Sequence, residues 1–366
     1  MLFSCRLAES FVIPFVATPG WLGSLARSSA LFVPAVAQDK VHWHRLGPDM
    51  AVEPVALKSA LSRIRASEPV KSFFFSPREQ VATFPEKLSP PAAERRVLFG
   101  VKNCDILPLL VHERMFLEGE FKDTFYQSRL ENTVLVAADC PLPEDSCFCT
   151  RVGRKPFVTE GADANLSLVD DGLLLEPLTA KGEELAAQAR AHARAATAAD
   201  LAFRQASREA ALAKLAQFNP VEWRSDPAAR IAKLKSDSPV WKKHASTCVE
   251  CFGCLMTCPT CYCFLLYDAK AGEGLGHDPK SKEDFGHVPR EVERTKVWDA
   301  CFIAAYQRVG GGANPRADFL KRFANRFQCK FQYFKDKHGF FACSGCGRCV
   351  KVCMGKIDLR NVIADA

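Results

Sequence analysis

The chain has 366 residues, which is enough for two or three domains of ordinary size. Hydrophobic residues make up 48% and charged residues 25%, as in globular proteins, and no apolar run is long and unbroken enough to predict membrane insertion. The net charge of +7 could favour an acidic protein partner, but no block of Lys and Arg indicates nucleic acid binding.

Residues 1–180 have the alternation of short apolar strands and helical segments that is typical of an α/β domain. The clearest unit has a strand at 97–101, a helix, and a second strand at 133–138. These elements predict a βαβ unit, whose two strands should be parallel neighbours. Asp171-Gly172 lies between two apolar runs and predicts a hairpin turn.

Residues 181–240 are expected to form a helical connector. The part from 181 to 218 is rich in Ala and charged residues, and it has no Pro and no Gly after Gly182, so it favours helix. Residues 241–366 are expected to form a mainly α-helical domain. The predicted fold is therefore α+β and multidomain.

An aromatic stripe marks the last domain, where phenylalanine recurs every four residues. Asn314-Pro315 predicts the start of the helix that carries it. The stripe indicates a buried helix face rather than a binding site. The cations between its members predict a solvated face, with a partner-docking surface as the alternative. The stripe is Phe319, Phe323, Phe327 and Phe331, and the cations are Lys321, Arg322, Arg326 and Lys330.

Cysteine is over-represented, with 17 residues, most of them clustered. A chain of this length can bury a core without disulfide staples, so CxxC spacing indicates metal ligands. Thiolate-rich sites also favour a reducing compartment, and we therefore expect a cytoplasmic protein.

Two four-cysteine runs carry the strongest signal. The first is Cys248-x2-Cys251-x2-Cys254-x3-Cys258, and the pattern recurs as Cys343-x2-Cys346-x2-Cys349-x3-Cys353. In two-cluster ferredoxins three thiolates of one run bind one cubane and the fourth ligand comes from the other run. The predicted ligand sets of the two [4Fe-4S] clusters are Cys248, Cys251 and Cys254 with Cys353, and Cys343, Cys346 and Cys349 with Cys258.

The order of motifs resembles a known family. FGVKNCD, SRLENTVLVAADC, CFC, CPTCYCF, WDAC and ACSGCGRCVKVCMGKID follow one another as in the beta subunit of sulfhydrogenase-type cytosolic nickel–iron hydrogenases, and equally as in the iron–sulfur subunit of anaerobic sulfite reductase. The resemblance covers roughly residues 31–363. It implies an accessory iron–sulfur electron carrier, placed between a flavin-bearing subunit that meets NAD(P)H and a catalytic subunit.

A middle group of cysteines has three possible interpretations. Two of them follow the strands of the βαβ unit, at the sheet edge where α/β proteins place their sites. Matching cysteines in the resembled family favour a third cluster, while a zinc site and four ordinary buried or redox-active thiols stay open. The group is Cys104, Cys140, Cys147 and Cys149. Asp105, beside Cys104, is either an extra ligand or a helix cap, and the cap is the preferred interpretation.

Three further cysteines, Cys261, Cys263 and Cys301, are expected to pack near a cluster and shield it, with ligation as the alternative. No general base beside a substrate pocket is evident in the sequence, so we expect no independent active site. The sequence thus predicts an electron-transfer subunit of an anaerobic oxidoreductase. The alternatives are a subunit of a heterodisulfide-reductase-like complex and a zinc-stabilised assembly module without a redox role.

Overall fold

The computed structural model describes most of the chain. The described residues are 10–50, 52–85, 94–220, 223, 226–270 and 292–366.

The larger sheet has eight strands in the order β3-β2-β5-β6-β7-β8-β1-β9. The strands β2, β5, β6 and β7 are parallel to one another, whereas the strands on either side pair antiparallel. Their bounds are β1 Phe11–Pro14, β2 Ala30–Ala37, β3 Lys40–Leu46, β5 Arg96–Lys102, β6 Thr133–Ala138, β7 Ala164–Leu168, β8 Gly172–Pro177 and β9 Arg194–Ala195.

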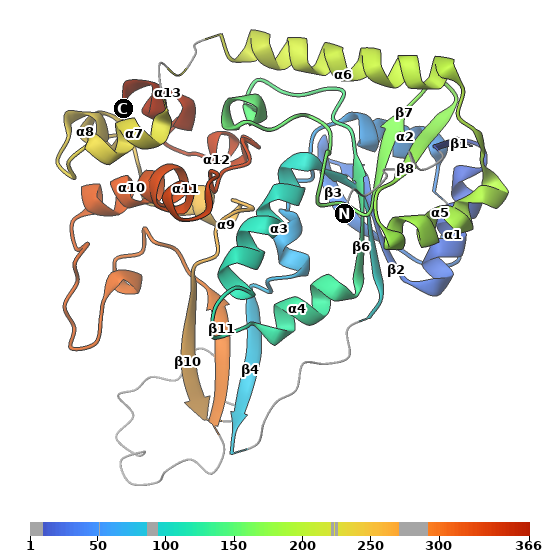
Figure 1. The fold of residues 1–366 in the computed structure, drawn as a ribbon. Coiled ribbons are helices and arrows are strands. Elements are labelled where there is room, and N and C mark those ends of the chain that lie inside the picture. Colours follow the sequence, from blue (N-terminus) through green and yellow to red (C-terminus); the bar gives the residue numbers. More distant parts are fainter. Residues whose placement is uncertain (1–9, 51, 86–93, 221–222, 224–225, 271–291) are drawn as a thin grey trace, which may run out of the picture.

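Helices cover both faces of this sheet (Figure 1). Trp21, Leu61 and Leu185, from three different helices, pack on the face that carries Phe99, and the opposite face carries Leu98. Parallel strands covered on both sides are apolar throughout, as β5 and β6 are. The helices are α1 Thr18–Ser28, α2 Pro54–Ser62 and α5 Ala180–Ala189 on the first face, and α3 Asn103–Phe116, α4 Thr124–Glu131 and the 3₁₀ turn η1 Val70–Phe73 on the second.

The predicted βαβ unit is confirmed. Strands β5 and β6 are parallel, with Val97 opposite Val134, and α3 and α4 lie between them along the chain. The hairpin is confirmed as well, because β7 and β8 pair antiparallel on either side of Asp171-Gly172.

The helix expected over 181–218 is interrupted. After α5 the chain makes a 3₁₀ turn, η3 Arg190–His192, and then adds β9 to the sheet beside β1. A second helix, α6 Ala198–Phe218, begins with a capping box of Thr197 and Asp200. Helix α6 runs from the end of the large sheet towards the C-terminal helices (Figure 1).

A three-stranded antiparallel sheet joins residues that are far apart in the sequence. Its order is β10-β11-β4. β4 (Arg78–Phe84) precedes the βαβ unit, whereas β10 (Phe264–Lys270) and β11 (Val292–Trp298) lie between the two cysteine runs. The sequence analysis did not predict this sheet.

The C-terminal helices enclose a second core around the aromatic stripe. Phe323, Phe327 and Phe331 are buried there, with Trp241 stacked on Phe327 at 5.5 Å between ring centroids, which confirms the predicted core face. A π-helical segment follows α10 and, by its wider turn, keeps Phe331 on that face. The elements are α7 Pro227–Lys233, α8 Pro239–Ala245, α9 Gly253–Met256, α10 Phe319–Phe327, the π-helix η5 Gln328–Tyr333, α11 Phe334–His338, α12 Arg348–Lys351 and α13 Leu359–Asp365, with 3₁₀ turns η2 Cys149–Val152 and η4 Ala305–Gln307.

Two local predictions about this region were wrong. Helix α10 begins at Phe319, and its N-cap is Asp318, whose carboxylate accepts from the Lys321 N–H. Asn314 instead closes a local turn, because its side chain accepts from the Arg316 N–H and donates to the Ala304 carbonyl. The prediction of a solvated cationic face was also wrong, since Lys321 is exposed but the other three cations are buried; they are Arg322, Arg326 and Lys330.

No helix in the described part of the chain is long and apolar enough to cross a membrane.

Candidate metal centres

The two cysteine runs have the same backbone shape. In the first run Glu250 and Phe252 have positive φ angles of 50° and 58°, and in the second run Gly345 and Gly347, at the equivalent places, have 64° and 72°. Each run continues into a one-turn helix, α9 or α12, and these two helices pack together. The repeat seen in the sequence is therefore also a structural repeat.

One pocket gathers the first predicted ligand set. Its lining includes Cys248, Cys251 and Cys254 from the first run together with Cys353 from the second. The Ile357 N–H donates to Cys353 Sγ at 3.3 Å. The exchange of the fourth cysteine between the two runs, which was inferred from spacing, is therefore compatible with the positions of these side chains.

The second predicted set lies deeper. Burial raises the pKa of the Cys349 thiol to about 12, and its neighbours Cys346 and Cys258 act in the same direction. Burial also raises the pKa of Cys343, with Cys349 and Cys258 again among the neighbours. The four thiols thus lie near one another.

Buried donors face both sets of thiols. Backbone N–H groups reach the first cysteine of each run, from Glu250 to Cys248 and from Gly345 to Cys343. Lys330 donates to Cys258 Sγ at 3.3 Å. Hydrogen bonds to sulfur and nearby positive charge are features that tune iron–sulfur clusters.

Arg326 provides the sharpest test of whether a cluster fits. Its burial disfavours the charged form, yet the thiols of Cys254 and Cys349 raise its pKa overall. Its Nε and one Nη are buried and have no hydrogen-bond partner among the described residues. A buried guanidinium without acceptors is costly. Cluster and thiolate sulfur atoms would supply the missing acceptors and negative charge, so the residues present fit two anionic clusters.

The middle group converges on a separate pocket. Its lining includes all four thiols and, in addition, Cys346 of the second run. Cys104 lies in the first turn of α3, at the end of β5, and Cys140 follows β6. Burial raises the pKa of Cys140 to about 11 and that of Cys149 to about 12. The loop after Cys140 carries Cys147 and Cys149, as the sequence analysis proposed.

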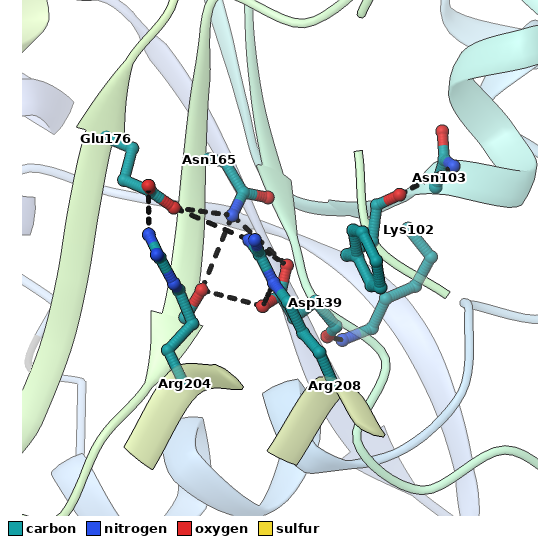
Figure 2. Close-up of polar contacts among 9 residues, drawn as sticks. Lys102, Asn103, Asp139, Asn165, Glu176, Arg204 and Arg208 are labelled. Carbon is teal, nitrogen blue, oxygen red and sulfur yellow. Dashed lines mark hydrogen bonds and ion pairs between the residues drawn. The ribbon is translucent and has the colours of Figure 1, made fainter. Parts of the chain in front are cut away.

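A polar network holds the backbone at Cys140 (Figure 2). The Asp139 carboxylate accepts from Ser167 Oγ at 2.7 Å, from Asn165 Nδ2 at 3.1 Å and from Arg208 Nε at 2.7 Å. The Asp139 carbonyl accepts from the buried Lys102 ammonium at 2.6 Å. Arg208 belongs to α6, so this helix fixes the site as well as connecting two parts of the chain.

The middle pocket abuts the second run directly. The Phe148 N–H donates to the Gly345 carbonyl at 2.9 Å. A Cβ on Gly345 would lie 2.5 Å from the Cys149 backbone, and one on Gly347 would lie 2.3 Å from the Ser146 carbonyl oxygen. Glycine at both places allows the two loops to touch.

Asp105 is not a helix cap. Helix α3 has Lys102 at its N-cap, without a side-chain cap, and the Asp105 carboxylate pairs with Arg348 instead. A zinc ion also finds no support, since in the described ranges no group of three or more His, Cys, Asp and Glu side chains could hold a single metal ion. Thiolates of a cubane bind different irons and stand farther apart than ligands of one tetrahedral zinc.

Several residues of these sites were missed by the sequence analysis, namely Arg65, Lys102 and Arg348. Arg65 lies 4.0 Å from Cys147 Sγ, and Lys102 bridges the carbonyls of Leu61 and Asp139. The one available signal was a cation within two residues of a candidate ligand, which Lys102 and Arg348 satisfy.

Comparison with known proteins agrees with this geometry. Residues 247–357 match the model of the 4Fe-4S dicluster domain, so the chain has the iron–sulfur domain that the two runs define. The chain is also 31% identical, over 309 residues, to the sulfhydrogenase 2 subunit beta of Pyrococcus furiosus, and the match spans 83% of this chain and 84% of that protein. The chain belongs to the family of sulfhydrogenase beta subunits.

Proposed function

We propose that this protein is the iron–sulfur electron-transfer subunit of a multisubunit anaerobic oxidoreductase in the cytoplasm. It relays single electrons between a flavin-bearing subunit, which is linked to NAD(P)H, and a catalytic subunit of the hydrogenase or sulfite reductase type. The observation that carries the proposal is the pair of like-shaped cysteine loops, with Cys353 of one lining the pocket of the other.

In this proposal the eight thiols of the two runs hold two [4Fe-4S] clusters. Bound clusters supply one-electron redox chemistry, and the protein sets their burial, spacing and hydrogen bonding. The first pocket has exposed residues at its edge, Cys251 and Val249, whereas Cys343 and Cys346 are buried. The first cluster is then the one that a partner can approach, and the second lies inside.

The middle thiols are proposed to hold a third cluster. Cys346 lines their pocket, so the third cluster would lie beside the second and extend the relay into the α/β domain. We keep the division into residues 1–180, 181–240 and 241–366 as the proposed domain organisation.

Anaerobic purification of the intact complex tests the proposal. Addition of NAD(P)H should bleach the visible absorbance of the clusters only when the flavin-bearing subunit is present. Co-purification with a nickel subunit indicates the hydrogenase setting, and co-purification with a sirohaem subunit the sulfite reductase setting. Clusters that stay oxidised in the complete complex, with reductant in excess, would contradict the relay.

A further inference from the structure

Four cysteines outside the two runs and the middle pocket also lie together. They come from separate segments: two follow the first run, one follows β11, and one lies on the π-helix η5. They are Cys261, Cys263, Cys301 and Cys329.

Their mutual contacts show the convergence. Cys263 and Cys301 are within hydrogen-bonding reach of each other. The pKa of Cys301 is raised by this contact and by burial, and Cys261 and Cys329 are near enough to act in the same direction. The long chain segment between Cys263 and Cys301 includes β10 and β11, whose antiparallel pairing brings Phe264 opposite Trp298 and so brings the two thiols together.

The surroundings provide donors and positive charge. The Tyr262 hydroxyl lies 3.5 Å from Cys329 Sγ, and Tyr306 makes a side-chain hydrogen bond to Cys263. The Lys71 ammonium donates to the Cys261 carbonyl at 3.0 Å. Lys330 is fully buried, and its charge is favoured by nearby thiols that include Cys261 and Cys329. This environment suits a bound anion better than four neutral thiols.

Shielding of a neighbouring cluster explains this arrangement less well. Shielding needs apolar bulk, but these thiols are met by two hydroxyls and two buried ammonium groups. One disulfide between Cys263 and Cys301 would leave the other two thiols unused. A single zinc ion does not fit, because no three such side chains in the described residues are close enough for one ion. The same spacing holds for the two ferredoxin-like runs, where clusters are expected.

We propose that Cys261, Cys263, Cys301 and Cys329 bind a further iron–sulfur cluster, next to the one that Cys258 helps to hold. Cys258 and Cys261 are in side-chain contact, so the new site adjoins the second cluster on the side away from the middle pocket's Cys346. The inference concerns binding by this chain, and it stands apart from which partners exchange electrons with it.

The test compares Cys301→Ser and Cys329→Ser in the full chain, prepared anaerobically, with Tyr333→Phe as the control. Tyr333 is exposed on the same π-helix as Cys329. Each serine variant should lose about two to four irons with an equal number of acid-labile sulfides, whereas the control should keep both. Iron and sulfide contents equal to wild type in both serine variants would overturn the proposal, as would loss of zinc in place of iron.

Two further measurements keep the result interpretable. If the serine variants do not accumulate, Tyr306→Phe keeps all four thiols; a shift in one magnetic signal of the reduced protein supports the proposal, and unchanged signals overturn it. Cys346→Ser separates this inference from the proposed function. Loss of iron in Cys346→Ser but not in Cys301→Ser leaves the relay in place and removes only the additional cluster.

Discussion

Asp105 and Arg348 form a two-point ion pair, with Oδ1 2.8 Å from Nη1 and Oδ2 2.7 Å from Nη2. Their side chains are 1% and 4% exposed. Asp105 follows Cys104 of the middle pocket, and Arg348 precedes Cys349 of the second run. Arg348 also donates to the carbonyls of Ala66 and Ser67. The pair therefore connects the proposed third site to the ferredoxin-like loops.

Breaking this pair should destabilise the whole protein. Asp105→Asn leaves the Arg348 charge buried without its counter-ion, for which we expect a loss of about 3–5 kcal/mol in the free energy of unfolding. Denaturant unfolding of the anaerobic protein measures it. Asp39→Asn is the control, because Asp39 pairs with Arg63 at the surface, where an ion pair contributes little. Equal unfolding midpoints for the two variants would contradict the role of the buried pair.

Arg326 should raise the reduction potential of both clusters. Removal of its charge in Arg326→Met disfavours the added electron, and we expect midpoint potentials lower by on the order of 60 mV, the equivalent of about 1.4 kcal/mol for one electron. Arg326→Lys keeps the charge and should recover much of the difference. Redox titration followed by magnetic resonance measures the shift, with Lys321→Met on the exposed face of α10 as the control. A potential unchanged in Arg326→Met would show that the guanidinium does not face the clusters.

Gly345 should not tolerate a side chain. Its φ of +64° disfavours Ala by roughly 1–2 kcal/mol, and a Cβ would meet the Cys149 backbone at 2.5 Å. Gly345→Ala should lower the thermal midpoint and reduce iron content in the middle pocket and the second run together. Gly310→Ala is the matched control, because nothing lies within 4 Å of its Cβ position. Normal iron content in Gly345→Ala would mean that the two loops do not need this contact.

The sequence predicted best what is local or repeated. The βαβ unit and the Asp171-Gly172 hairpin follow from short apolar runs and one turn, and the cysteine runs follow from spacing alone. Features that depend on distant partners were missed. Strand β4 is a charged segment whose partner lies more than 200 residues further along the chain. Arg326 and Lys330 have the pattern of a solvated helix face, and only the thiols opposite them explain their burial.

The fourth-ligand exchange is the central claim, and Cys353→Ser tests it most directly. Cys353 is in the second run, yet it lines the pocket of the first. Iron, sulfide and Mössbauer analysis of the anaerobic full chain should show damage to the cluster held by Cys248, Cys251 and Cys254, with the cluster of the second run intact. Met354→Leu, at an exposed neighbouring position, should change neither cluster. Loss of the second-run cluster alone, or a wild-type chain free of iron and acid-labile sulfide, would contradict the account.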